Sequence, residues 1–179
     1  MTILVDGDSA AMSSVDGQKS WPEIIGATFL GGRSRTVLDA VQSLTDIQWR
    51  KPSVYICQFG LWSAWKPREY SHNEPINEFY TRLVGLLTSL REMGVKAIFI
   101  TPPVYLEDRP YLYDVRRYGM MGMIAAYKTG AWGISVDAFM LAESLHNPDW
   151  RSWFMANDPH YHLSPLGHEK VASYLRPHL

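Results

Sequence analysis

The chain has 179 residues, and its 17 Lys and Arg against 18 Asp and Glu give a formal net charge of −1. This length predicts a single domain over residues 1–179, and the near-neutral charge argues against nucleic acid or an anionic membrane surface as the main partner. The one cysteine, Cys57, excludes an intramolecular disulfide and a multi-cysteine metal cage.

The hydropathy pattern argues against two kinds of targeting segment. No apolar run reaches the about 18 residues that a membrane-spanning helix needs. The first residues lack the basic start of a signal peptide, and their apolar run ends at Asp6. We therefore expect no membrane span and no secretion, and either a cytoplasmic protein or a module of a larger or phage-particle protein.

Short apolar runs alternate with amphipathic segments along the chain. The first run, residues 2–5, predicts a buried strand that ends in a tight turn. A glycine turn at 30–34 precedes a helix that begins at Ser34 or Arg35, and residues 76–93 keep one face apolar at helical spacing. The remaining predictions are strands at 54–59, 95–100 and 133–137, helices at 113–129 and 165–175, and a loop at 157–167.

This alternation is typical of a three-layer α/β/α sandwich with a parallel sheet of four to five strands. Each predicted strand is a continuous apolar run, as expected for a strand that is buried on both faces. In such sheets the reactive groups lie beyond the carboxyl ends of the strands. The residues that directly follow the strands are therefore the first candidates for a functional site.

The first predicted strand is followed by Gly7-Asp8-Ser9. A serine at this position can project its hydroxyl over the sheet edge, and its own backbone N–H can donate to an oxyanion. Gly-Asp-Ser is also a common turn, in which the serine only caps a helix. The turn alone therefore leaves both a nucleophile and a helix cap open.

The segment 157–168 contains what a serine nucleophile needs. Such a serine requires a histidine base within hydrogen-bond reach and a carboxylate that orients the base. Half of the six histidines of the chain lie in this segment, close after an aspartate. A metal site also stays open, because carboxylate and imidazole groups at this spacing are plausible zinc ligands: Asp158, His160, His162 and His168.

Together, the two ends of the chain resemble the SGNH, or GDSL-type, hydrolase family. Gly7-Asp8-Ser9 matches the first sequence block of the family, whose serine is the nucleophile. The segment 162–167, His-Leu-Ser-Pro-Leu-Gly, is similar to the last block, which carries the histidine base. The resemblance spans nearly the whole chain and implies a flavodoxin-like strand order.

The second and third sequence blocks of the family also have counterparts in this sequence. Gly31 resembles the second-block glycine whose N–H donates to the oxyanion, with Gly32 as the near alternative. The segment 58–63 lies where the third block belongs, and Gly60 matches its glycine. Trp62 stands where the family has an asparagine that donates to the oxyanion. The indole N–H of Trp62 or the backbone of Gly60 can replace it, or the oxyanion hole uses only Ser9 and the second block.

The last block departs from the family in its spacing. The family places the acid three residues before the histidine, and Pro159 occupies that position if His162 is the base. Asp158 lies four residues before His162 and two before His160. Either the segment carries one extra residue or His160 is the base. The distance to Gly167 favours His162.

The resemblance implies a serine ester hydrolase that needs no metal and no organic cofactor. Ser9 would attack an ester carbonyl, His162 would take its proton, and Asp158 would hold the imidazole. The aromatic content and a common activity of the family favour a small-molecule or glycan ester, above all an O-acetyl group on a carbohydrate. Arg33 and Arg35 beside the second block are candidate contacts for an anionic substrate group, or solvated charges.

Three other functions remain open at this stage. An O-acyltransferase of the same fold would use the same residues but exclude water from the acyl-enzyme. A carbohydrate-binding relative without catalysis is favoured by Trp62 and by the shifted Asp158. A metal-dependent hydrolase would lose activity with a chelator and keep it in Ser9→Ala.

Overall fold

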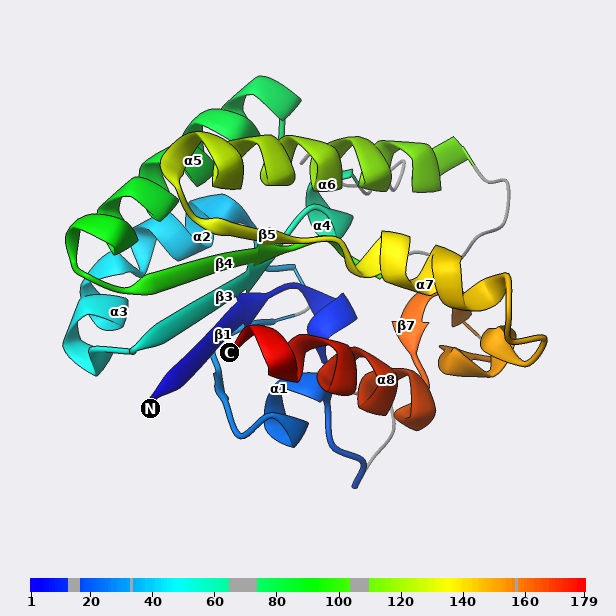
Figure 1. Ribbon diagram of the computed structural model, residues 1–179. Coiled ribbons are helices and arrows are strands. Elements are labelled where there is room, and N and C mark those ends of the chain that lie inside the picture. The colour runs from blue at the N-terminus through cyan, green and yellow to red at the C-terminus, as the bar shows by residue number, and fades with distance from the viewer. Residues whose placement is uncertain (13–16, 33, 65–73, 104–109, 157) are drawn as a thin grey trace.

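A computed structural model describes residues 1–12, 17–32, 34–64, 74–103, 110–156 and 158–179, without the side chains of 110–112 and 158–161. Five parallel strands form the central sheet, in the order β2-β1-β3-β4-β5 (Figure 1). This is the flavodoxin-like order, and it confirms the parallel sheet, whose five strands lie within the expected four to five. The strands are β1 (Ile3–Gly7), β2 (Thr28–Phe29), β3 (Val54–Gln58), β4 (Lys96–Ile100) and β5 (Trp132–Ile134).

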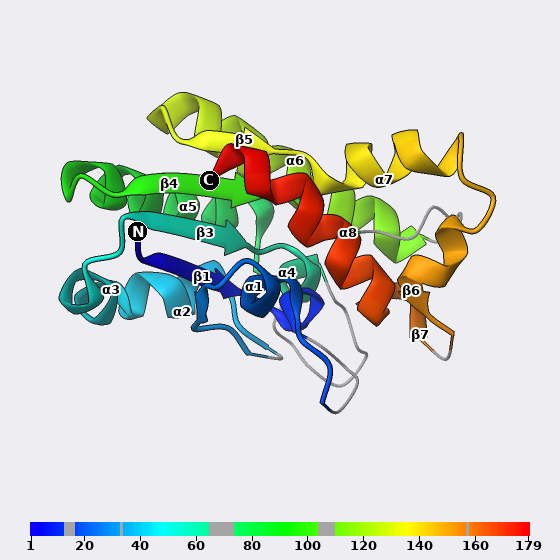
Figure 2. The same cartoon turned by 60° about the horizontal axis from the view of Figure 1, so that its bottom comes forward.

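Helices cover both faces of the sheet, as a three-layer α/β/α fold requires (Figures 1 and 2). One face carries α2 (Val37–Gln42), α3 (Leu44–Arg50), α5 (Ile76–Glu92) and α6 (Pro110–Thr129). The other carries α1 (Trp21–Ile24), α7 (Val136–Ser144) and α8 (Pro165–Leu175). The short α4 (Leu61–Ala64) follows β3, and 3-10 turns occur at η1 (Ser9–Ala11), η2 (Trp150–Trp153) and η3 (Arg176–His178).

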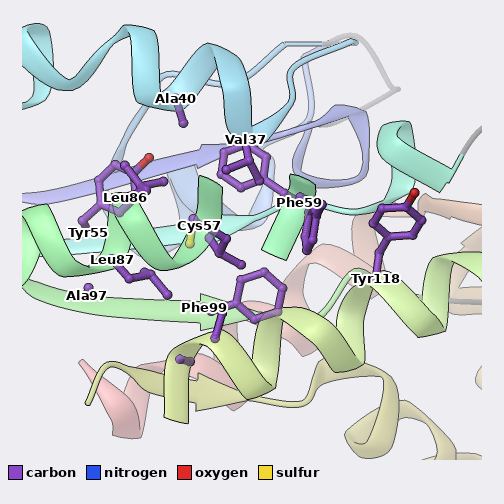
Figure 3. Close-up of a cluster of buried hydrophobic side chains, with 14 of the residues drawn as sticks. Val37, Ala40, Tyr55, Cys57, Phe59, Leu86, Leu87, Ala97, Phe99 and Tyr118 are labelled. Atoms are coloured by element: carbon purple, nitrogen blue, oxygen red, sulfur yellow. The ribbon is translucent and has the colours of Figure 1, made fainter. Parts of the chain in front are cut away.

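Alternating residues of the strands belong to two separate hydrophobic cores, one on each face of the sheet. Tyr55 and Cys57 of β3 point toward α2, α5 and α6, as does Phe99 of β4 (Figure 3). Ile56 of β3 points the other way, toward the layer of α1, α7 and α8. Because both faces of each strand are buried, the apolar runs in the sequence are continuous rather than alternating.

The pairing of β1 with β3 explains why β1 is longer than its apolar run. The parallel register continues from Ile3 opposite Val54 to Gly7 opposite Gln58. Asp6 and Gly7 are thus strand residues, although the hydropathy pattern predicts a strand that ends at residue 5. The strand delivers the following turn directly to the carboxyl edge of the sheet.

Several predicted boundaries are wrong. The helix expected from residue 34 or 35 is split into α2 and α3 at Ser43, and β2, α1 and α7 were not predicted. The segment 157–167, predicted as a loop, contains β7 (Asp158–Leu163), which pairs antiparallel with β6 (Phe154–Met155). Among the described residues, no helix combines the length and the apolar character needed to cross a bilayer.

Candidate active site

Ser9 opens the 3-10 turn η1 immediately after β1, at the carboxyl edge of the sheet. Its side chain is half-buried. Asp8 caps the turn by accepting a hydrogen bond from the Ala10 N–H at 3.1 Å. Within the described part of the chain, the backbone N–H of Ser9 makes no hydrogen bond. This N–H is therefore available for an oxyanion.

The second block lies beside this turn, and its two glycines differ in their contacts. The N–H of Gly32 donates to the Gly7 carbonyl oxygen at 3.1 Å, so it is occupied. The N–H of Gly31 has no hydrogen-bond partner among the described residues. A Cβ on Gly31 would overlap the Phe29 ring and the Gly7 carbonyl oxygen, whereas a Cβ on Gly32 would meet nothing within 4 Å. The contacts therefore favour Gly31 over Gly32 as an oxyanion donor.

Two backbone N–H groups of the third block are already occupied. The N–H groups of Leu61 and Trp62, at the start of α4, both donate to Asp8 Oδ2, at 3.1 and 3.3 Å. Gly60 before them has a φ of 127°, which favours glycine, and a Cβ there would lie 3.0 Å from Cβ of Tyr118. The N–H groups of Leu61 and Trp62 thus bind the Asp8 carboxylate and cannot donate to an oxyanion at the same time.

The block is also anchored from its other side. The hydroxyl of Ser63 donates to Glu74 Oε2 at 2.8 Å, and Arg82 donates to Glu74 Oε1 at 2.7 Å. The Tyr118 hydroxyl donates to the carbonyl oxygen of Glu74. The glutamate was not a candidate from the sequence, because it precedes a helix without any motif. It fixes α4 against α5 and α6.

Asp8 is the residue whose importance the motif did not reveal. Its carboxylate is fully buried and accepts three backbone N–H groups, one from η1 and two from α4. It therefore ties the Ser9 turn to the third block. Burial raises the pKa of Asp8 to about 7, although its hydrogen bonds with Ala10, Trp62 and Leu61 lower it.

This pKa predicts an unusual pH dependence of stability. Between about pH 4 and pH 7 the folded state holds the Asp8 proton and the unfolded chain releases it, so the contribution of Asp8 to stability falls as the pH rises. In Asp8→Asn this dependence should vanish. The difference in unfolding free energy between wild type and variant should change on the order of 4 kcal/mol over this range. Denaturant unfolding at pH 4 to 8 measures it.

The control is Asp46→Asn, which removes one exposed carboxylate from α3. Asp8→Asn also loses hydrogen bonds at every pH, since an amide cannot accept at both ends. That loss lowers the unfolding free energy by the same amount at every pH and does not change its slope against pH. Parallel pH profiles for wild type and Asp8→Asn would contradict the raised pKa.

His162, the predicted base, lies near the end of β7 and is half-buried. The strand packs against η1, which begins with Ser9. Its end is fixed because the Ser164 N–H donates to the Trp153 carbonyl oxygen at 2.8 Å. Gly167 follows closely, and a Cβ there would overlap the same carbonyl. The fold thus brings the last block of the sequence to the first.

Other predicted site residues fall outside what the structure describes. The side chains of Asp158 and His160 are among them, although their backbones belong to β7. Arg33 lies outside the described residues altogether. The acid of the triad and the choice between His160 and His162 therefore stay predictions.

His168 does not fit the open metal site that the sequence left possible. It is completely buried in α8, and its Nδ1 accepts a hydrogen bond from the Trp21 N–H at 3.1 Å. Burial lowers the pKa of His168 to about 4, so the ring is neutral at ordinary pH. Among the described residues, no group of three potential ligands clusters. His168 is better explained as a link between α8 and α1.

Arg35 is also not the free cation that an anionic substrate would require. Its guanidinium forms a two-pronged ion pair with buried Asp6, through Nε and, at 2.8 Å, through Nη2. The Tyr55 hydroxyl donates to the same carboxylate at 2.9 Å. These contacts hold the loop of Gly31 against β1.

No protein-family model matches the sequence, and no curated protein is significantly similar to it. Among solved structures, the chain is similar to the acetyl xylan esterase AlAXEase, with a TM-score of 0.82 and 16% identity over 100% of both chains. Axe2, an acetylxylan esterase from Geobacillus stearothermophilus, has a TM-score of 0.76 and 19% identity over 98% of this chain and 92% of its own.

A third similar structure is LAE5, an α/β hydrolase enzyme from the metagenome of Lake Arreo in Spain. Its TM-score is 0.79, at 16% identity over 98% of this chain and 93% of that one. The solved forms of Axe2 include catalytic mutants in which a histidine, a serine or an aspartate is replaced by alanine. At these identities the likeness shows a common fold, which confirms the expected three-layer architecture.

Proposed function

We propose that the protein is a serine ester hydrolase that removes small acyl groups, above all acetyl groups, from a carbohydrate. The observation that carries this proposal is the packing of β7, with His162, against the turn that Ser9 opens. Elements that carry a serine and a histidine and contact each other beyond the carboxyl edge of a parallel sheet, beside two backbone N–H groups that have no partner among the described residues, are what acyl transfer would need.

In this mechanism His162 takes the proton of the Ser9 hydroxyl as Ser9 attacks the ester carbonyl. The tetrahedral oxyanion accepts hydrogen bonds from the N–H groups of Ser9 and Gly31. The alcohol leaves with a proton from His162, and water activated by the same histidine then releases the acid from the acyl-enzyme. Asp158 orients the imidazole and stabilises its charged form.

The substrate class rests on the similar structures and on the composition. Two of the three are named as acetyl xylan esterases, and they share this fold over nearly their whole length. Aromatic residues make up 13% of the sequence. Their rings have an apolar body and, in Tyr and Trp, a polar tip, which suits contact with a sugar. A short acyl group on a carbohydrate is therefore the substrate we propose.

Hydrolysis of p-nitrophenyl acetate by the purified protein tests the reaction class. We expect release of nitrophenol that is unaffected by EDTA and blocked by a fluorophosphonate probe of nucleophilic serines. Activity that disappears with EDTA would support a metal-dependent hydrolase instead. A product that forms only when an acceptor alcohol is added would indicate an acyltransferase. Failure of both hydrolysis and probe labelling would contradict the proposal.

A further inference from the structure

A polar hollow of about 260 Å³ adjoins the loop that carries Gly31. It lies between this loop and the first turn of α2. Gly31 also faces the carbonyl oxygen of Gly7, close to Ser9 in the chain, so a ligand in the hollow would lie beside the candidate oxyanion donor. The lining residues are Leu30, Gly31, Gly32, Ser34, Arg35 and Asp39.

Arg35 enters the hollow with most of its guanidinium already fixed. Its Nε and Nη2 bind Asp6, and Nη2 also donates to the Ser43 hydroxyl at 3.2 Å. Its Nη1 has no hydrogen-bond partner among the described residues. The side chain is 17% exposed. Arg35 is therefore a rigidly held donor that costs little entropy to use.

Asp39 is held in a similar way and supplies an acceptor. Its Oδ2 accepts from the N–H and the hydroxyl of Thr36, at 2.7 and 2.8 Å, in the capping box of α2. Its Oδ1 has no partner in the described part of the chain, and neither has the exposed hydroxyl of Ser34. The hollow thus offers donors and an acceptor within one loop and one helical turn.

The charges of the described lining residues do not favour an anion. The positive charge of Arg35 is compensated by Asp6, and Asp39 adds a negative charge. Neighbouring hydroxyls, which donate and accept at once, match the available groups, and Leu30 offers an apolar contact for C–H bonds. We propose that the hollow is a subsite for a sugar ring of the acetylated carbohydrate, an inference that rests on the proposed function.

Two substrates on one enzyme test the subsite. The first is p-nitrophenyl acetate, which has no sugar, and the second is an acetylated xylo-oligosaccharide. In Ser34→Leu, whose side chain would project into the hollow, we expect the ratio of kcat/KM for the oligosaccharide to kcat/KM for p-nitrophenyl acetate to fall about tenfold, as for one lost hydrogen bond. Ser34→Ala, which removes only the hydroxyl, should lower it less.

The matched control is Thr88→Leu. Thr88 lines a second hollow, of about 380 Å³, which is formed by residues of α5 and α6. This variant should keep the wild-type ratio. A ratio that does not change in Ser34→Leu would overturn the subsite, and so would an equal loss on both esters, which would indicate a displaced loop.

The experiments can disprove the subsite and the proposed reaction separately. If the wild type hydrolysed neither ester, the reaction would be wrong, and binding would still test the hollow. Titration of wild type and Ser34→Leu with the deacetylated xylo-oligosaccharide, followed by calorimetry, would then decide. Binding that is weakened by Ser34→Leu would support a sugar site, and no binding to the wild type would overturn it.

Discussion

Replacing Ser9 by alanine is expected to lower the turnover of p-nitrophenyl acetate on the order of 10⁴ to 10⁶-fold. Without the hydroxyl no acyl-enzyme can form, and only the oxyanion donors and substrate binding remain. The half-buried position of Ser9 at the start of η1 leaves the fold little affected by the loss of one oxygen. Steady-state kinetics, with circular dichroism to check folding, measure the effect.

The histidines of β7 provide the comparison. His162→Ala should lose nearly as much activity as Ser9→Ala, and the double variant should lose no more than either single one, because the two residues act as a unit. His160→Ala should lose far less. The opposite order would identify His160 as the base. Activity that survives in Ser9→Ala would rule out the serine mechanism.

Replacing Gly31 by alanine is expected to reduce turnover on the order of 10² to 10³-fold, the usual effect of losing one oxyanion donor. The new Cβ would overlap the Phe29 ring and the Gly7 carbonyl oxygen, so the loop must move. Phe29 can rotate, but the Gly7 carbonyl is part of strand β1 and cannot yield without disturbing Ser9. Kinetics on p-nitrophenyl acetate and thermal unfolding measure both consequences.

Alanine variants of two further glycines serve as controls, because neither is expected to displace the Gly31 N–H. Gly32→Ala places its Cβ in open space and keeps the bond to Gly7, so it should lose much less activity than Gly31→Ala. Gly85→Ala, on the exposed face of α5, should leave turnover unchanged and stabilise the helix by about 1 kcal/mol. Equal losses in Gly31→Ala and Gly32→Ala would contradict the assignment of Gly31.

The sequence was most informative where one periodicity dominates. Five buried residues of α5 recur at helical spacing, and the structure places this helix within one residue of its predicted bounds. The layered fold followed from the continuous apolar runs. β2 could not be predicted, because its two residues become a strand only by pairing with Leu4 and Val5 of β1. β7 could not be predicted for the same reason. Its polar residues show no alternation of apolar and polar positions, and it becomes a strand only by pairing with β6.

In the candidate site, too, local motifs could be recognised in the sequence, whereas roles that depend on tertiary contacts could not. Motif positions predicted Ser9, Gly31 and His162 as site residues, and the fold gathers the elements that carry them at one sheet edge. The role of Asp8 could not be inferred, because it depends on Leu61 and Trp62, which are distant in the chain. The backbone N–H of Trp62 binds Asp8, and the use of its indole N–H in place of the missing asparagine stays a prediction. Only three-dimensional contacts distinguish a capping residue of a turn from a link between two blocks.

The distance in sequence between η1 and β7 has a consequence for biosynthesis. Ser9, the proposed nucleophile, leaves the ribosome long before His162, the proposed base. Strands β1 to β5 all precede β7 in the chain, so they become available for pairing before the segment of His162 is made. Under the proposed mechanism, the nascent protein would be unable to cleave esters until β7 packs against η1, and ester cleavage would report the completion of this part of the fold.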